Sequence, residues 1–229
     1  MSLTFIEETH TYIGSSGREI PSVTRAMDHS GLVNFAFVRE EILMRRSELG
    51  REAHRAVRYY NEAALDMDSV DPQVMPYLQS WMKVVEHTKF VPLLSEFQCE
   101  AQLDRMYYGM TLDTSGIFGG DDSILDFKIG KPHWAHGVQL AGYVIGLPHP
   151  TLYTPMAKFS TRKRYGVYLK ESGEMAKVIP YKDTRDFQTF WACLELTTRK
   201  MQQGQKIRKI EETDDGRNDD DAAAGNNLF

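Results

Sequence analysis

Two aspartates and a lysine have the types and the spacing that suit hydrolysis of a phosphodiester bond. Asp113 ends one predicted strand, and Asp126 and Lys128 lie in the next one, after a glycine-containing turn. Adjacent strands bring the two aspartates together, and the alternation of side chains puts Asp126 and Lys128 on one face. Paired carboxylates bind Mg²⁺ or Mn²⁺, which polarises a phosphoryl oxygen and activates water, while a lysine offsets the developing negative charge.

An Asp-x-Lys triplet also has a simpler explanation, a surface ion pair across a hairpin that is worth about 0.2–1 kcal/mol. Asp126, however, lies within the apolar run Ile124-Leu125-Asp126-Phe127. A carboxylate buried there would be costly unless a metal ion or a base compensated its charge. The apolar surroundings therefore favour a functional aspartate over a surface ion pair.

Gln139 and Tyr143 are four residues apart on a predicted helix, so they share one of its faces. With the preceding acids and lysine they form a pattern that resembles the PD-(D/E)XK nuclease superfamily, in particular its RecB-like, phage-type exonuclease branch. In that branch an acid-x-lysine pair follows a glycine-preceded aspartate, and a Gln-x-x-x-Tyr helix comes next. The resemblance extends over about residues 5–147, and its most specific part is 109–143. It implies that Gln139 and Tyr143 shape the catalytic site or contact DNA.

The resemblance also implies roles for the acids and the lysine. Asp113 and Asp126 would be metal ligands, the backbone carbonyl of Phe127 would add a further ligand, and Lys128 would serve the attacking water or the transition state. His54 corresponds to a histidine that similar enzymes place on a helix near the metal. The expected cofactor is Mg²⁺ or Mn²⁺.

A third acid is expected upstream of Asp113, and two glutamates compete for this role. Glu96 and Glu100 are four residues apart in a predicted strand and therefore face the same side. The spacing to Gly109 favours Glu96 by resemblance, and Glu100 stays open. The iron–sulfur variants of the superfamily use four cysteines, whereas this chain has only Cys99 and Cys193, so no iron–sulfur cluster is expected.

Basic residues and one aromatic residue are candidates for a DNA-binding surface, because contacts to phosphates supply most of the affinity that is independent of sequence. The alternative is that they form an ordinary solvated surface. The candidates are Arg51, Arg55, Lys131, Trp134, Lys158, Arg162, Lys163 and Arg164.

Around these residues the hydrophobic periodicity predicts a mixed order of helices and strands. A glycine turn closes an N-terminal hairpin, and a helical stretch follows with a break at Gly50. Asp71 and Pro72 predict the start of the next helix. The remaining predicted elements are strands at 93–103, 106–112 and 123–128, a helix at 133–145, strands at 152–159, 165–169 and 175–181, and a helix at 183–205.

This order predicts an α/β (α+β) fold with a mixed central sheet flanked by helices, which the resemblance identifies as a restriction-endonuclease-like core. The 229 residues suit one nuclease domain at 1–210 and an acidic, disordered tail at 211–229. The tail has a net charge of −6, which leaves +1 for the rest of a chain whose total is −5. A near-neutral body neither requires nor excludes nucleic acid.

The first eight residues lack the pattern of a signal peptide, and no apolar run approaches the roughly 18 residues that span a bilayer. We therefore expect a cytoplasmic protein with no membrane partner, encoded, by resemblance, by a phage or prophage in a bacterial host. The expected function is a metal-dependent DNA exonuclease that acts on linear ends in replication, recombination or repair. An endonuclease of the same fold and a catalytically degenerate binding module are the alternatives.

The acidic tail ends in Leu228-Phe229, like the tails of bacterial single-strand DNA-binding proteins, which dock partners through a terminal phenylalanine. Solubility is its simplest role. The other hypothesis is that it recruits a single-strand DNA-binding or recombination protein, or shields a basic channel. Deletion of residues 211–229 should then change DNA affinity or the proteins recovered in a pull-down, and no change in either would exclude this hypothesis.

Overall fold

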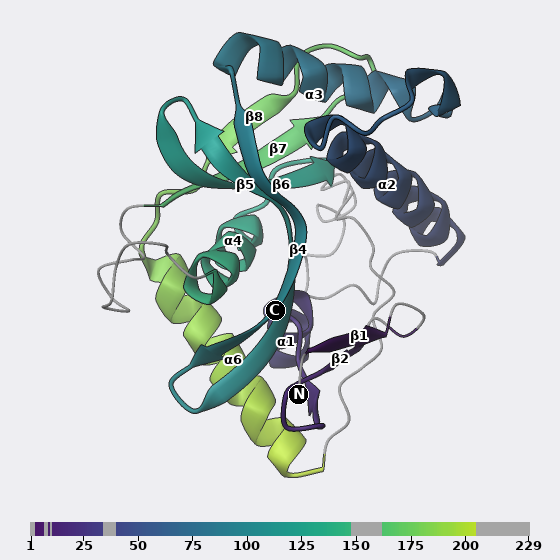
Figure 1. Cartoon of the computed structure of the whole chain (residues 1–229). Coiled ribbons are helices and arrows are strands. Elements are labelled where there is room, and N and C mark those ends of the chain that lie inside the picture. Colours follow the sequence, from purple (N-terminus) through teal and green to yellow (C-terminus); the bar gives the residue numbers. More distant parts are fainter. Residues whose placement is uncertain (1–2, 7–8, 10, 34–39, 148–161, 205–229) are drawn as a thin grey trace, which may run out of the picture.

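A computed structural model describes residues 3–6, 9, 11–33, 40–147 and 162–204 of the chain. Figure 1 shows a long sheet with helices packed on both of its faces. In chain order the elements are β1 (Thr4–Ile6), β2 (Thr11–Ile13), β3 (Glu19–Ile20), α1 (Val23–Ser30), α2 (Glu40–Asn61), η2 (Met67–Ser69), α3 (Met75–Thr88), β4 (Val91–Leu103), β5 (Met106–Phe118), β6 (Asp121–Ile129), α4 (Ala135–Gly146), β7 (Lys163–Leu169), β8 (Lys177–Pro180) and α6 (Arg185–Gln202).

The central sheet has the strand order β4-β5-β6-β7-β8. Strands β4, β5 and β6 form an antiparallel meander, β6 and β7 are parallel, and β8 returns antiparallel to β7. Helix α4 lies in the connection between the two parallel strands, as a parallel pair requires a crossover. The predicted mixed sheet flanked by helices is therefore confirmed.

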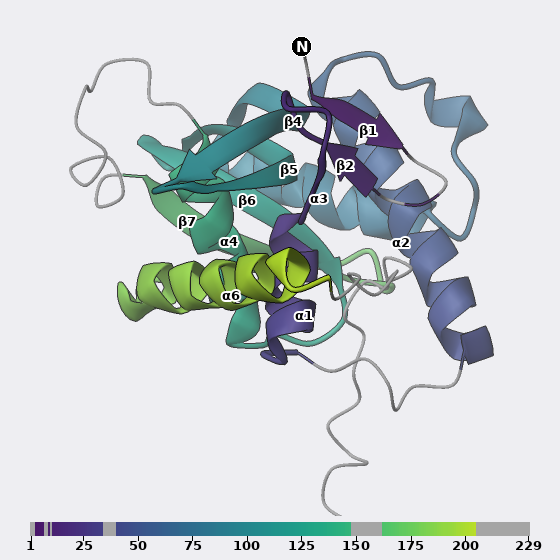
Figure 2. The ribbon, with the colours of Figure 1, turned by 90° about the horizontal axis from the view of Figure 1, so that it is seen from below.

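Two hydrophobic cores lie on opposite faces of this sheet. Helices α1, α4 and α6 enclose one core, and α2 and α3 enclose the other (Figures 1 and 2). Strand β6 contributes to both, because Ile124 points into the first core while Leu125 and Phe127 point into the second. Burial on both faces explains the apolar residues in the second half of β6 and makes its two buried charged residues, Asp126 and Lys128, exceptional.

The N-terminal strands β1, β2 and β3 form a small sheet that packs against β5. A side chain at Gly109 would collide with this sheet, since an added Cβ would lie 2.2 Å from Cγ of Tyr12. The Gly109 N–H donates a hydrogen bond of 2.9 Å to the carbonyl of Pro21. Glycine is thus required here by the close approach of the Tyr12 ring.

Several predicted boundaries need correction. Helix α2 continues through Gly50, where a break was predicted, because a single glycine costs a helix only about 1 kcal/mol and packing against α3 offsets that. Helix α3 begins at Met75, since Asp71 instead caps a preceding turn through a 2.7 Å hydrogen bond from the Gln73 N–H. Strand β5 extends to Phe118, and the turn is only two residues long.

The predicted strand at 152–159 and the acidic tail at 211–229 lie outside the described residues. Within the described residues, no helix combines the length and the apolar character that crossing a bilayer requires.

Candidate active site

The site forms where strands β5 and β6 stop pairing. Their hydrogen-bonded ladder ends at the pair Thr114 and Leu125, and Asp113 and Asp126 are the next residues beyond it. In place of a further ladder bond, the Phe127 N–H donates to Oδ2 of Asp113 over 2.6 Å. The two predicted aspartates are therefore neighbours at a fork in the sheet, as their positions on adjacent strands predict.

A cluster that could hold a metal ion lies on the α2 side of this fork. It consists of His54 from α2, Glu96 from β4 and Asp113 from β5, whose candidate ligand atoms all lie within 4.8 Å of one another. Nδ1 of His54 is 3.6 Å from Oδ1 of Asp113. Two carboxylates and one imidazole form a donor set that suits Mn²⁺, and Mg²⁺ with the help of water ligands.

Glu96 reaches this cluster through an unusual backbone conformation. It lies between Ser95 and Phe97, which pair with Thr114 and Leu112, so it stands opposite Asp113. Its φ of 47° is in the left-handed region, which costs a residue other than glycine about 1–2 kcal/mol. Such strain in the middle of a strand is typical of functional positions.

Glu100, the competing glutamate, makes structural contacts elsewhere. Its carboxylate accepts hydrogen bonds from the N–H and the hydroxyl of Ser15, at 2.7 and 3.2 Å. These bonds tie β4 to the N-terminal hairpin. The structure therefore places Glu96, and not Glu100, with Asp113.

Asp126 and Lys128 form an ion pair on the α4 side of the sheet, with 2.9 Å between Nζ and Oδ2. Asp126 is 1% exposed and Lys128 is 9% exposed. The alternation of side chains along β6 correctly predicted their shared face. Asp126 was also predicted to bind the metal together with Glu96 and Asp113, but its carboxylate lies outside the cluster that these two form with His54.

The two aspartates have opposite pKa shifts. Burial raises the pKa of Asp126 to about 6 and Asp113 adds to the rise, while Lys128 and His136 counteract it. Burial would also raise the pKa of Asp113, but His54, Lys128 and the Phe127 N–H outweigh it, so the pKa is lowered. Asp113 is thus the more readily ionised of the two, and a further positive charge beside Asp126 would stabilise its ionised form.

Gln139 and Tyr143 close the site from α4. Nε2 of Gln139 donates to the Tyr143 hydroxyl over 3.0 Å, and both side chains are buried. Burial raises the pKa of Tyr143 well above its ordinary value, and the charges of Asp126 and Asp113 add to this. The predicted shared helix face is confirmed, and its charged neighbours are the two aspartates.

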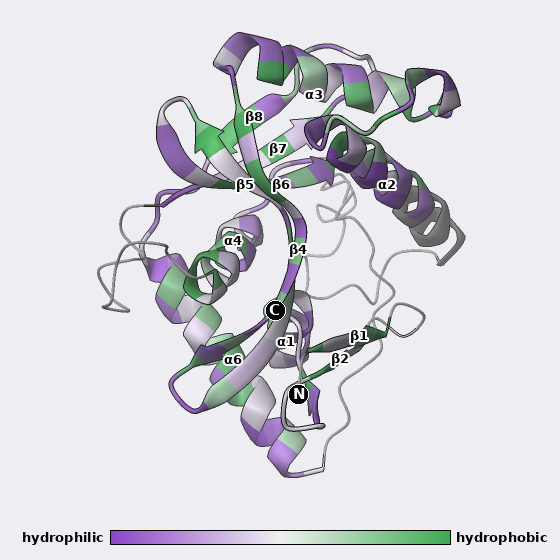
Figure 3. Cartoon of the chain, in the orientation of Figure 1, coloured by the Kyte–Doolittle hydropathy of each residue, from purple (hydrophilic) through white to green (hydrophobic). Residues whose placement is uncertain are grey.

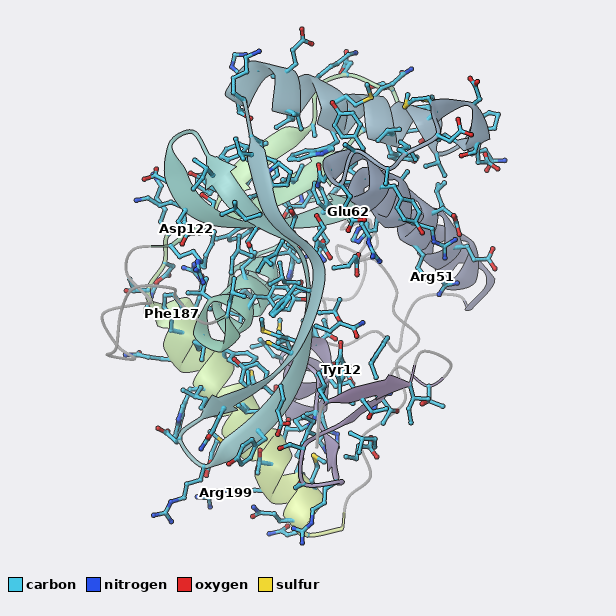
Figure 4. The ribbon with its side chains drawn as sticks, in the orientation of Figure 1. Tyr12, Arg51, Glu62, Asp122, Phe187 and Arg199 are labelled. Atoms are coloured by element: carbon cyan, nitrogen blue, oxygen red, sulfur yellow. The ribbon has the colours of Figure 1, made fainter. Side chains whose placement is uncertain are left out.

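The basic candidates divide into exposed and buried residues. Arg51, seen on α2 in Figure 4, and Arg55 are exposed, although Arg55 pairs with Glu52 at 2.8 Å. Figure 3 colours many residues of α2 as hydrophilic. Lys131 and Trp134, which is 56% exposed, follow β6 directly. The remaining exposed candidate is Lys163, at the start of β7, and Lys158 lies outside the described residues.

Arg162 and Arg164 do not line an open channel, which corrects the expectation for both. Arg162 is buried and binds Asp122 and the carbonyl of Leu147. Arg164 is buried as well, and donates to the Asp186 carboxylate over 2.9 Å. A buried arginine can donate hydrogen bonds to carbonyl and carboxylate oxygens inside the protein. Because these oxygens come from distant segments, only the tertiary structure shows that the arginine is buried.

Sequence reasoning missed the polar residues that pack beside Asp126. His136 of α4 is not among the predicted site residues, yet it is buried and its Nδ1 lies 2.7 Å from the Tyr168 hydroxyl. Tyr168 in turn contacts Tyr181. No local signal in the sequence separates these residues from other histidines and tyrosines, because their partners come from distant segments.

Comparisons with known proteins support the fold. No family model matches the sequence, and no curated protein matches it. The structure is similar to the crystal structure of a protein from Eubacterium rectale whose exonuclease assignment is itself provisional, with a TM-score of 0.50, 10% identity, and coverage of 92% of this chain and 89% of that chain. A second solved structure, that of SSO0001, has a TM-score of 0.35 and 15% identity over 82% of this chain and 86% of that chain, and carries no argument.

The raised pKa of Asp126 predicts how metal-free stability depends on pH. Because the pKa in the folded state exceeds that of the unfolded chain, protonated Asp126 stabilises the fold at about pH 4, and this contribution is lost as the pH rises through 6. Relative to Asp126→Asn, the wild type should lose up to about 3 kcal/mol of unfolding free energy between pH 4 and 8. Urea unfolding in EDTA measures this, with Asp121→Asn, an exposed aspartate of the same strand, as control. A difference that stays constant with pH would contradict the prediction.

The metal cluster predicts unequal effects of two matched substitutions in β4. Glu96→Gln should weaken Mn²⁺ binding, because it removes a carboxylate from the cluster. We expect a loss of affinity of about ten-fold or more, since about ten-fold is already lost when a residue that only supports a ligand is removed. Glu100→Gln should leave the affinity unchanged, since Glu100 binds Ser15. Titration calorimetry of both variants measures the affinities. Equal affinities would exclude Glu96 as a ligand.

Proposed function

We propose that this chain is a metal-dependent deoxyribonuclease that hydrolyses phosphodiester bonds at the ends of linear DNA. The observation that carries the proposal is the convergence at one fork of a metal-binding cluster and a buried Asp–Lys pair. These groups come from α2, β4, β5 and β6, so a surface hairpin with a chance ion pair does not account for them. The cofactor of the proposal is Mg²⁺ or Mn²⁺.

The ligands in this proposal are His54, Glu96 and Asp113, with the carbonyl of Phe127 as a further donor. Asp126, which lies outside their cluster in the structure, would join them when the cation binds. Among the described residues, Oδ2 of Asp126 receives no hydrogen bond of good geometry, although Lys128 lies 2.9 Å away. A buried carboxylate oxygen of this kind fits a hard cation. Binding of the cation would also favour the ionised form of Asp126, whose pKa is otherwise raised to about 6.

Bound metal would polarise the scissile phosphate and lower the pKa of the attacking water. The Phe127 N–H donates to the Asp113 carboxylate and would keep it oriented toward the metal. Lys128 would hold the attacking water or offset the negative charge that develops on the phosphate. Gln139 and Tyr143, which are joined by a 3.0 Å hydrogen bond, would line the site on the α4 side and keep bulk water out.

The DNA path that we propose runs past exposed residues at both sides of the fork. Arg51 and Arg55 would contact phosphates from α2, and Lys163 from the start of β7. Lys131 and Trp134 immediately follow the strand that carries Lys128, so they would meet the DNA near the scissile bond. An exposed tryptophan offers a ring on which a base can stack.

Action at ends, as opposed to internal cleavage, is favoured by the motif resemblance and by the exonuclease assignment of the Eubacterium rectale protein. A role in phage replication, recombination or repair within a bacterial cytoplasm belongs to the same proposal. So does recruitment of a DNA-binding partner through residues 211–229.

Digestion of three DNA substrates tests the proposal. With Mg²⁺ or Mn²⁺ the wild type should degrade linear single-stranded or duplex DNA and leave covalently closed circles intact. Asp126→Ala and Lys128→Ala should lower the rate by about 10²-fold or more, because each removes a group that acts on the reacting phosphate. Lys170→Ala serves as control and should retain activity, because this half-buried lysine just after β7 pairs with Glu174 and belongs to none of the groups of the site.

Cleavage of the circles would replace the exonuclease with an endonuclease of the same fold. No metal-dependent cleavage by pure protein would overturn the enzymatic proposal and favour a binding module. Equal activity of wild type and Lys128→Ala would remove the lysine from the mechanism.

A further inference from the structure

A chain of buried polar groups lies beside the Asp126–Lys128 pair. Nδ1 of His136 on α4 is 2.7 Å from the hydroxyl of Tyr168 on β7. That hydroxyl is 2.5 Å from the hydroxyl of Tyr181, which donates to the carbonyl of His133 over 2.9 Å. The chain thus connects α4, β7, the segment after β8 and the loop between β6 and α4.

Counting protons assigns a direction to this chain. Each phenol has one proton, and Tyr181 uses its own for the carbonyl of His133. The proton in the short hydrogen bond between the two phenols must therefore come from Tyr168. With that proton used, Nδ1 of His136 must carry a proton and donate to Tyr168. The His133 N–H points at the same Nδ1 over 3.3 Å, which would require Nδ1 as an acceptor. A proton on Nδ1 leaves this longest of the four contacts unsatisfied, whereas a lone pair on Nδ1 would leave one of the three shorter contacts without a proton.

The chain occupies space beside the active-site strand. In the parallel pairing of β6 and β7, Asp126 stands opposite Gly166, and Lys128 stands opposite Tyr168. A Cβ at Gly166 would lie 2.9 Å from the Tyr168 hydroxyl and 3.0 Å from the Tyr181 ring. The Tyr168 side chain therefore folds back over Gly166, next to Asp126, and glycine leaves the room for it.

Electrostatics agree with this placement. Burial raises the pKa of Tyr168, and after Tyr181 the charge of Asp126 is a further cause. His136 in turn is one of the groups that counteract the rise in the pKa of Asp126. The phenols and the imidazole thus share an environment with the Asp126–Lys128 pair, without contributing to the cluster of His54.

We propose that His136, Tyr168 and Tyr181 form a positioning network that holds the Asp126–Lys128 pair in its reactive arrangement and fixes the loop that carries Lys131 and Trp134. This inference rests on the proposed nuclease function and deepens it. The network touches neither the water nor the phosphate directly. Its loss should therefore lower the rate of the bound complex more than the affinity for DNA.

The first test needs no enzymatic activity. NMR of the protein with isotopically labelled histidine at pH 8 should show a proton on Nδ1 of His136, with the resonance assigned through His136→Asn. In Tyr168→Phe the acceptor is gone, so the proton should move to Nε2. An Nε2–H tautomer in the wild type, or an unchanged tautomer in Tyr168→Phe, would overturn the network.

The second test is steady-state cleavage of a linear oligonucleotide with Mn²⁺. Tyr168→Phe and Tyr181→Phe should each lower kcat about ten-fold with KM within about two-fold, since small misplacements of catalytic groups are costly. Gly166→Ala should reproduce the loss by displacing the Tyr168 hydroxyl. Tyr165→Phe is the matched control, because the same change on the opposite face of β7, where Tyr165 packs against Phe118, should leave kcat unchanged.

The outcomes separate the two proposals. An active wild type with unchanged kcat in Tyr168→Phe would overturn the positioning role alone. A wild type without metal-dependent cleavage would overturn the nuclease function and, with it, the positioning role, whatever the tautomer shows. A lower kcat with unchanged KM, together with the predicted tautomer, would support both.

Discussion

Asp113 accepts a hydrogen bond from the Phe127 N–H at the point where β5 and β6 cease to pair. This bond takes the place of a ladder bond, so the strands separate without leaving that backbone donor unsatisfied. On one side of it the Phe127 ring packs in the α2–α3 core against Trp81. On the other side Asp126 and Lys128 face α4. Phe127 therefore has two roles. Its buried ring fixes the position of its backbone, and the N–H of that backbone orients the Asp113 carboxylate.

The candidate site contains two features that destabilise the folded state. Asp126 is a nearly fully buried carboxylate with a raised pKa, and Glu96 has a left-handed backbone inside a strand. Each feature costs free energy in the metal-free chain, and the two hydrophobic cores on either face of the sheet supply the stability that offsets this cost. Backbone strain at Glu96 and burial of Asp126 at one fork of the sheet favour a functional site over a surface ion pair.

Several features could not be predicted because their causes are contacts between distant segments. Glu96 and Glu100 share one face of a predicted strand, so the sequence favours Glu96 by resemblance alone. The contact between Glu100 and Ser15 of the N-terminal hairpin is what separates them. Arg162 and Arg164 look like surface bases in the sequence, but acceptors from other elements bury them. Gly50 looks like a helix break, yet the helix continues through it.

The local pattern of residues determined the mixed order of helices and strands, the neighbouring positions of Asp113 and Asp126 on adjacent strands, and the shared faces of Asp126 with Lys128 and of Gln139 with Tyr143. These follow from the periods of strands and helices, which act over a few residues. Tertiary structure decided which glutamate joins His54, that Asp126 pairs with lysine outside that cluster, and that His136 meets Tyr168. Such contacts depend on how separate elements pack, since burial and hydrogen-bond partners are set by the whole fold and not by neighbours in the chain.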